Sequence, residues 1–213
     1  MSSLKIDGSL LVHSWINDPR EKENHQYSLD RYFGIGKSDE VFQGRNFEWF
    51  VSKSNSELFT AFDFLAIGSL SVEIPAESQR MLLEDSGSNY ASLLRECMDY
   101  VQLNHAAEDL TWVWKVGNPL EALYLKVRSV NGVGPVVCSK LMAAKFPTVI
   151  PIRDSKVEKL LGSEKSVAWW EPMLELFASV EETLSHLETG HVNVTNLRKL
   201  DVILWMEAQN RGL

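Results

Sequence analysis

The sequence predicts an all-α protein, and two observations support this fold class. From about residue 60 onward, apolar residues recur at the spacing of amphipathic helices. Capping residues and breakers, among them the pair Asn118-Pro119, divide this pattern into successive segments. With 213 residues and 45% hydrophobic content, the chain is long enough to bury a substantial core.

The first quarter of the chain, residues 1–57, is the least regular. Its stretch DPREKENHQ is typical of a solvated loop, and the following aromatic residues are mixed with glycines. We therefore expect residues 1–57 to wrap around a helical domain formed by residues 58–213.

The helical part begins with a capping pattern, in which Thr60 precedes Asp63 by three residues. Pro75 suits the first turn of the next helix, which a Ser-Gly-Ser break ends at residues 86–88. The further helices expected up to the centre of the chain are NYASLLRECMDYVQL and HAAEDLTWVWKV. Those expected after it are DSKVEKLLG, VAWWEPMLELFA, VEETLSHLE and TNLRKLDVILWMEAQN.

The centre of the chain predicts a helix-hairpin-helix at residues 119–146. Asn118 and Pro119 open a helix, VNGVGP follows, and PVVCSKLMAAK forms a second helix. Gly132 and Gly134 allow a tight turn, and Val133 between them can fill the gap between the two helices.

This hairpin is a candidate for binding DNA. Gly134, Pro135 and Val136 stand at the start of the second helix, where main-chain N–H groups lack partners within the helix. A phosphate oxygen can accept hydrogen bonds there, assisted by the helix dipole. A plain structural turn is the alternative, because many helix–helix connections use two glycines.

Residues 119–162 resemble the helix-hairpin-helix DNA glycosylase superfamily. In that superfamily a catalytic aspartate follows the hairpin at about the interval that separates Gly134 from Asp154. The resemblance implies that Asp154 stands beside a flipped-out nucleotide and assists cleavage of its glycosidic bond. Members with lyase activity carry a lysine where this chain has Val136, so only a monofunctional glycosylase is implied. The alternative is that Asp154 merely caps the helix that follows it.

Other candidate contacts are less specific. Lys140, Arg153 and Lys156 are basic residues in or near the hairpin and are expected to meet phosphate, with a solvated surface position as the alternative. Trp112 and Trp169 are candidates for stacking on an extruded base, because each belongs to a cluster of tryptophans in which one ring is expected to be exposed. Packing in the core is the alternative for both rings.

Composition excludes several classes of protein. The formal net charge of −8 excludes nonspecific coating of nucleic acid, so any DNA contact has to be local. The two cysteines, Cys97 and Cys138, cannot form a zinc site or a four-cysteine cluster, so we expect buried thiols, no metal and no cofactor. No signal peptide or membrane span is evident, and the expected location is the cytoplasm.

The whole chain also resembles an uncharacterised bacterial family, through FQGRNFEWF, FDFLAIGSLSVEIP and LRKLDVILWM in addition to the hairpin. The leading interpretation is a DNA-binding protein with base excision as its reaction. The alternative is a noncatalytic helical module that binds a protein partner, which the pocket around Asp154 and the charge around the hairpin would distinguish. The sequence does not indicate an oligomeric state.

Overall fold

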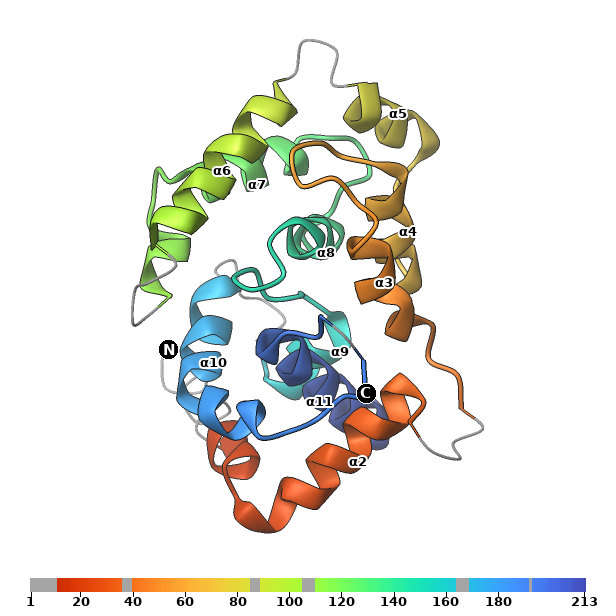
Figure 1. Cartoon of the computed structure of the whole chain (residues 1–213), viewed down its shortest axis with the longest axis vertical. Helices are drawn as coiled ribbons and strands as arrows, with labels where there is room; N and C mark the ends of the chain where they lie inside the picture. The colour runs from red at the N-terminus through yellow and green to blue at the C-terminus, as the bar shows by residue number, and fades with distance from the viewer. Residues whose placement is uncertain (1–10, 36–39, 85–88, 105–109, 164–168, 192) are drawn as a thin grey trace. The chain divides into compact units, whose positions relative to one another are not determined.

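The computed structural model describes residues 11–35, 40–84, 89–104, 110–163, 169–191 and 193–213, and in these ranges every regular element is a helix (Figure 1). The predicted all-α class is confirmed. By its contacts the chain forms two compact units, residues 1–45 with 151–213 and residues 46–150. The boundary expected at residue 57 differs from these boundaries, and the expected domain division stays a prediction. No described helix is long and apolar enough to cross a membrane.

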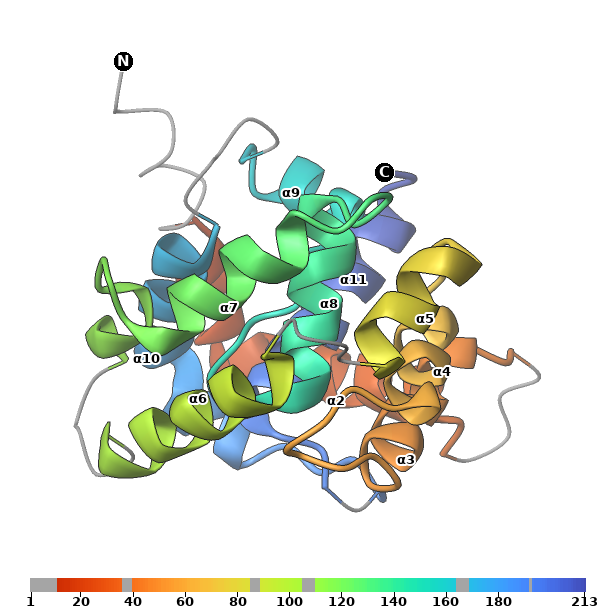
Figure 2. The same cartoon turned by 90° about the horizontal axis from the view of Figure 1, so that it is seen from above.

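The unit of residues 46–150 is built around α8 (Pro135–Lys145). Every residue of α8 from Cys138 to Lys145 is buried, as expected of a helix with neighbours on all sides. Figure 1 shows α8 nearly end-on, with α6 and α7 on one side and α3 and α4 on the other, and Figure 2 shows the same order from above. The other helices are α3 (Phe47–Val51), α4 (Ala61–Ser69), α5 (Ala76–Glu84), α6 (Tyr90–Asn104), the 3-10 helix η3 (Thr111–Trp114) and α7 (Pro119–Arg128).

Local capping fixes where the helices of this unit begin. The predicted capping box is present at α4, where the Asp63 carboxylate accepts from the Thr60 N–H at 2.7 Å. Asn118 caps α7 by accepting from the Glu121 N–H at 2.8 Å, and its amide also donates to the Val113 carbonyl at 2.8 Å. Asn118 therefore connects η3 to α7.

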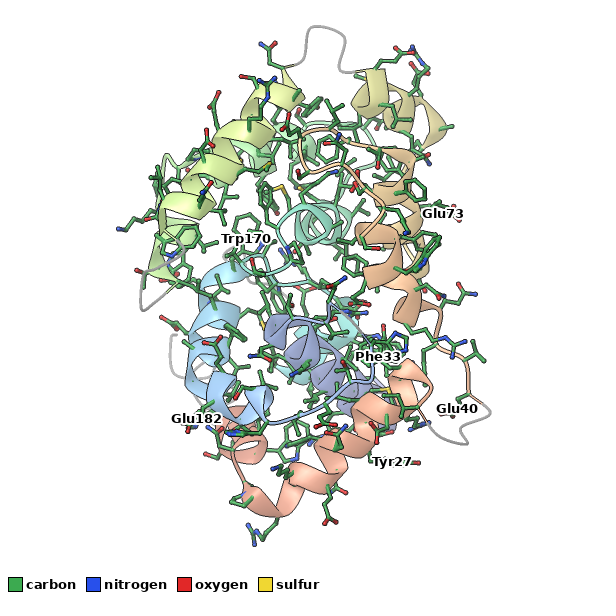
Figure 3. The ribbon with its side chains drawn as sticks, in the orientation of Figure 1. Tyr27, Phe33, Glu40, Glu73, Trp170 and Glu182 are labelled. Carbon is green, nitrogen blue, oxygen red and sulfur yellow. The ribbon has the colours of Figure 1, made fainter. Side chains whose placement is uncertain are left out.

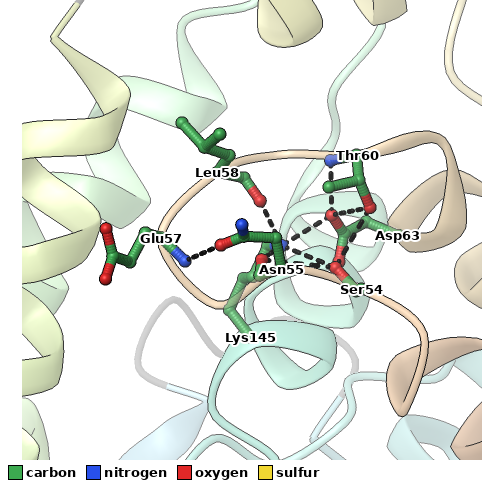
Figure 4. Close-up of polar contacts among 7 residues, drawn as sticks. All are labelled: Ser54, Asn55, Glu57, Leu58, Thr60, Asp63 and Lys145. Atoms are coloured by element: carbon green, nitrogen blue, oxygen red, sulfur yellow. Dashed lines mark hydrogen bonds and ion pairs between the residues drawn. The ribbon is translucent and has the colours of Figure 1, made fainter.

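A buried lysine at the end of α8 holds the loop between α3 and α4 (Figure 4). The Lys145 ammonium lies 2.9 Å from Ser54 Oγ and donates to the carbonyls of Asn55 and Leu58 at 2.7 and 2.6 Å. Its fourth oxygen partner is the Asp63 carboxylate. The cluster joins α8, the loop and the first turn of α4.

The other unit is centred on α11 (Asn196–Asn210), which packs against α2 (Lys22–Phe33), α9 (Ser155–Leu160) and α10 (Trp170–Ser185). The 3-10 helix η1 (Pro19–Glu21) leads directly into α2, and residues 11–16 are also helical. The 3-10 helix η2 (Gln43–Asn46) spans the boundary between the two units. The buried Arg198 of α11 is ion-paired with Asp201 and donates to the Tyr32 hydroxyl at 2.8 Å. Lys199 donates to the Leu184 and Leu187 carbonyls at the end of α10.

Three local predictions were wrong. The stretch expected to be a solvated loop, DPREKENHQ, contains η1 and the start of α2, with Asp18 as the cap and Pro19 in the first turn. The two helices expected after residue 167 form one helix, α10, because no breaker lies between them. Of the helix expected in HAAEDLTWVWKV, only η3 forms within the described residues, and residues 105–109 lie outside them.

Candidate nucleic-acid interface

The predicted hairpin consists of α7, the turn of residues 129–134, and α8. The Val133 N–H donates to the Val130 carbonyl at 3.1 Å, and the Val130 N–H donates to the Val127 carbonyl at 3.1 Å, so the turn is tight. The Val133 side chain is 3% exposed, and so it fills the gap behind the turn. The Ser78 hydroxyl of α5 donates to the Asn131 carbonyl at 2.7 Å and thus supports the tip.

The two glycines of the turn have different roles. Gly132 has a φ of +76°, and a Cβ atom there would lie only 2.5 Å from the Pro75 ring. The turn itself therefore requires glycine at this position. Gly134 has a φ of −74°, which any residue adopts, and a Cβ atom there would meet nothing within 4 Å. The fold leaves open space directly in front of the Gly134 backbone.

The first turn of α8 presents main-chain donors beside this space. Pro135 has no N–H, so the donors are the N–H groups of Gly134, Val136 and Val137, and these residues are half-exposed. None of these three N–H groups has an acceptor among the described residues. The partial positive charge of the helix start is directed to the same place.

Arg128 adds a cation next to these donors. It lies in the last turn of α7, is half-exposed, and its Nη1 donates to the Val133 carbonyl at 2.5 Å. Arg128 was not predicted from the sequence as a contact, although a basic residue in the last turn of a helix that precedes a hairpin is a usable signal.

The predicted phosphate contact of Lys140 does not fit its position. The residue is 3% exposed, and its ammonium donates to the Leu70 carbonyl at the end of α4 at 2.9 Å. Because α8 is buried from Cys138 onward, the Lys140 side chain lies inside the unit and not on the surface of the hairpin.

Asp154 belongs to the other unit, where it is the N-cap of α9. Its carboxylate accepts from the Lys156 N–H at 3.0 Å, as the capping alternative expects, and the residue is half-buried. The capping role is therefore present, and a catalytic role stays a prediction.

The two basic neighbours of Asp154 differ from each other. Arg153 is 8% exposed, and its guanidinium is ion-paired with the Glu158 carboxylate at 2.6 Å. It is therefore not the surface charge that the sequence predicts. Lys156 is half-exposed, and its ammonium donates to Gln209 Oε1 and to the Leu213 carbonyl, both at 2.8 Å. Only Lys156 of this pair has a position from which it can meet a phosphate.

Trp112 and Trp169 are both buried, at 4% and 3% exposure, and they lie in different units. The Trp112 ring packs edge-on against Tyr100, and the Arg153 guanidinium lies over the Trp169 ring. Among the described residues, neither indole N–H has an acceptor. The half-exposed rings of the two clusters are Trp114 and Trp170 instead, so stacking of a base on Trp112 or Trp169 stays a prediction.

The two cysteines and the possible metal ligands are the remaining groups that the sequence singled out. Cys97 and Cys138 are free and fully buried, as predicted, and burial raises the pKa of each thiol to about 12. Among the described residues, no three His, Cys, Asp or Glu side chains gather at a distance that suits a metal ion.

Comparison with known proteins places the chain in one family. The model of the Family of unknown function (DUF6308) matches residues 26–208, and the chain therefore belongs to this family. No curated protein and no solved structure matches the chain. The family supports the predicted resemblance to uncharacterised proteins and leaves the activity open.

Proposed function

We propose that this member of the family binds DNA through the hairpin of residues 119–146. The phosphate backbone is the part of DNA that would be contacted, by the N–H groups of Gly134, Val136 and Val137. Because phosphates are the same at every base pair, binding of this kind does not depend on sequence.

The open space in front of Gly134 is the observation that carries the proposal. The backbone conformation of Gly134 does not need glycine, and no protein atom occupies the place of its missing side chain. A glycine in this position leaves room for a ligand to approach the backbone closely. The adjacent N–H groups select a ligand with acceptor oxygens and negative charge.

Charge favours local contact of this kind. A chain with a formal net charge of −8 is repelled by DNA at a distance, so binding requires donors that act at short range. Main-chain N–H groups meet this requirement. Arg128 adds one positive charge beside them, because its guanidinium is held at the Val133 carbonyl.

Binding can be measured by fluorescence anisotropy with a short labelled duplex at low salt. We expect Gly134→Asp to reduce affinity at least tenfold, because its carboxylate would occupy the phosphate position. The fold should persist, since a side chain at residue 134 points into open space. Arg128→Gln should weaken binding and reduce the salt dependence of the affinity.

The matched control is Leu103→Asp, which adds the same charge at a leucine that is 83% exposed on α6. It should leave the affinity nearly unchanged. Equal affinity of Gly134→Asp and wild type, with both proteins folded, would contradict the proposal.

Base excision is the reaction proposed for the same protein, and it rests on the resemblance in residues 119–162 and on Asp154. The carboxylate of Asp154 would stabilise positive charge that develops on the sugar, or activate the attacking water. Because no lysine stands at residue 136, strand cleavage at the resulting abasic site would require added alkali.

Asp154→Asn separates catalysis from capping, because asparagine is an equally good N-cap but carries no charge. Wild type and variant would be incubated with duplexes that carry deaminated, oxidised or alkylated bases and then treated with alkali. We expect cleavage of one substrate class by wild type, and loss of that cleavage in the variant with unchanged thermal stability. If wild type cleaves none of them, the protein is a DNA binder without this activity.

A further inference from the structure

The tip of the hairpin contains the only Asn-Gly pair of the sequence, Asn131-Gly132. The main-chain nitrogen that follows an asparagine can attack its side-chain amide, and this attack is easiest at glycine because no side chain obstructs the approach. Both residues of the pair are exposed. Water and hydroxide can therefore reach the pair in the folded protein.

The two groups that would react at this pair are not held by other parts of the protein. Within the described residues, the Asn131 side chain has no hydrogen-bond partner and the Gly132 N–H has no acceptor. Asn55, which precedes Ser56, differs in this respect, because its side-chain oxygen accepts from the Glu57 N–H at 2.7 Å (Figure 4). The Asn131 side chain is thus available for reaction, whereas the side chain of Asn55 is held in place.

Positive groups lie near the attacking nitrogen. Its attack requires loss of the Gly132 amide proton, which leaves negative charge on the nitrogen. The Arg128 guanidinium is held at 2.5 Å from the Val133 carbonyl, on the next residue of the chain, and the positive start of α8 follows. Glu73 points away from α8 (Figure 3), and it is the Pro75 ring that lies against the tip. These surroundings favour loss of the amide proton.

A hydrogen bond from Ser78 restrains the reaction. The Val133 N–H donates to the Val130 carbonyl, and φ is positive at Gly132 but not at Asn131, so the tip is a type II turn. At the ψ of about +120° that a type II turn has at its second residue, the Gly132 nitrogen is turned away from the Asn131 side chain. The peptide between them has to rotate before attack, and rotation breaks the 2.7 Å hydrogen bond from the Ser78 hydroxyl to the Asn131 carbonyl.

We propose that Asn131 is a site of spontaneous modification, at which the side chain closes a ring onto Gly132 and then opens to aspartate or isoaspartate. In the first step the Gly132 nitrogen bonds to the Asn131 Cγ atom, the Cγ–Nδ2 bond breaks, and ammonia leaves with the proton from the Gly132 nitrogen. In the second step water opens the cyclic imide. Attack of water at Cγ gives aspartate, and attack at the main-chain carbonyl carbon gives isoaspartate.

The modification would change the hairpin in two ways. Either product adds a negative charge near the N–H groups of Gly134, Val136 and Val137. Isoaspartate also adds one carbon atom to the main chain of the tip, so the type II turn no longer closes in the same way. The consequence for DNA rests on the proposed function, under which both products weaken the contact with phosphate.

Mass spectrometry of the aged protein tests the modification directly. The folded protein is incubated in mildly alkaline buffer and digested, and the peptide that spans residue 131 is compared with that of a sample digested at once. We expect this peptide to lose its amide with time and to accept a methyl group from a protein isoaspartyl methyltransferase. Asn131→Gln should stay unchanged, because glutamine has to close a larger ring. If residue 131 keeps its amide while a synthetic peptide of residues 128–136 converts in the same buffer, the proposal is overturned.

Ser78→Ala tests the restraint. Conversion at residue 131 should become up to roughly tenfold faster, which is the factor that loss of one hydrogen bond allows. Asn55 is the internal control, because it lies in the same unit. Unfolding of the unit would accelerate conversion at both asparagines, whereas loss of the Ser78 hydrogen bond accelerates it at Asn131 alone. Equal rates at residue 131 in wild type and Ser78→Ala would rule out the role of Ser78.

DNA affinity separates the modification from the proposed function. Asn131→Asp carries the charge of the aspartate product from the outset and should bind the labelled duplex several-fold more weakly than Asn131→Gln. Aged wild type should lose affinity in proportion to the conversion that mass spectrometry measures. If isoaspartate forms and the affinity stays the same, the modification site is supported and DNA binding by the hairpin is contradicted.

Discussion

The Lys145 ammonium lies 2.6 Å from the Asp63 carboxylate, and both side chains are almost completely buried, at 1% and 0% exposure. Burial lowers the pKa of Lys145, and the Asp63 charge and hydrogen bond oppose this shift. Four oxygen atoms surround the ammonium, so the buried charge is well compensated.

Replacement of Lys145 by methionine should be strongly destabilising. Methionine keeps most of the volume but leaves the Asp63 carboxylate buried without its counter-charge, which costs roughly 3–5 kcal/mol of unfolding free energy. Urea unfolding followed by tryptophan fluorescence measures this change. Lys159→Met, at an exposed lysine of α9, is the control and should change stability by less than about 0.5 kcal/mol.

The double variant Lys145→Met/Asp63→Asn tests the cause of that loss. It should be less destabilised than the sum of the two single variants, because it removes both charges together. Additive effects would show that packing, and not the ion pair, determines the contribution of Lys145.

His25 should make the stability of the protein depend on pH. Its ring is buried edge-on against Trp15, and burial lowers its pKa, with smaller opposing effects from the Trp15 carbonyl and from Glu21 and Glu207. Below the ordinary histidine pKa, the unfolded chain binds a proton that the folded chain does not. Stability should therefore fall as the pH drops from about 7 toward 5, by at most about 1.4 kcal/mol per pH unit.

The histidine contribution is isolated by comparing His25→Phe with wild type across this range. The variant should lose less stability on acidification, whereas His186→Phe, at an exposed histidine, should follow the wild-type curve. Parallel curves for wild type and His25→Phe would assign the acid sensitivity to other groups.

The two hairpin glycines should respond differently to alanine. Gly132→Ala places a side chain at a φ of +76° and against the Pro75 ring, so it should cost at least about 1–2 kcal/mol. Gly134→Ala should leave stability unchanged or raise it by up to about 1 kcal/mol, because its conformation suits alanine and the space is open. Thermal unfolding followed by circular dichroism compares them, and equal losses would mean that the turn also needs glycine at residue 134.

The hairpin was predictable from the sequence because its determinants are local. The determinants are the cap at Asn118, the Pro residues that begin α7 and α8, and the left-handed position at Gly132, and each of them acts on the few residues next to it in the chain. The capping box of Thr60 and Asp63 was predictable for the same reason.

Burial of charged residues was not predictable, because it depends on partners that are distant in the sequence. The sequence predicts a phosphate contact or a solvated position for Lys140, but the Leu70 carbonyl to which its ammonium donates is 70 residues away. Helix α2 was missed because its buried positions, His25, Leu29, Tyr32 and Phe33, are separated by polar residues that suggested a loop. The sequence shows the charge of a residue but not the neighbour that stabilises it inside the protein.

Neither cysteine should react with a thiol reagent in the folded protein. Cys97 and Cys138 are fully buried, and a thiol with a pKa of about 12 forms almost no thiolate at pH 8. With Ellman's reagent we expect no rapid absorbance change under native conditions and labelling of both thiols in denaturant. Any slow labelling of the native protein should require opening of the unit of residues 46–150, so it should be faster in Lys145→Met. Rapid labelling of the wild type would show that at least one of the two thiols is accessible.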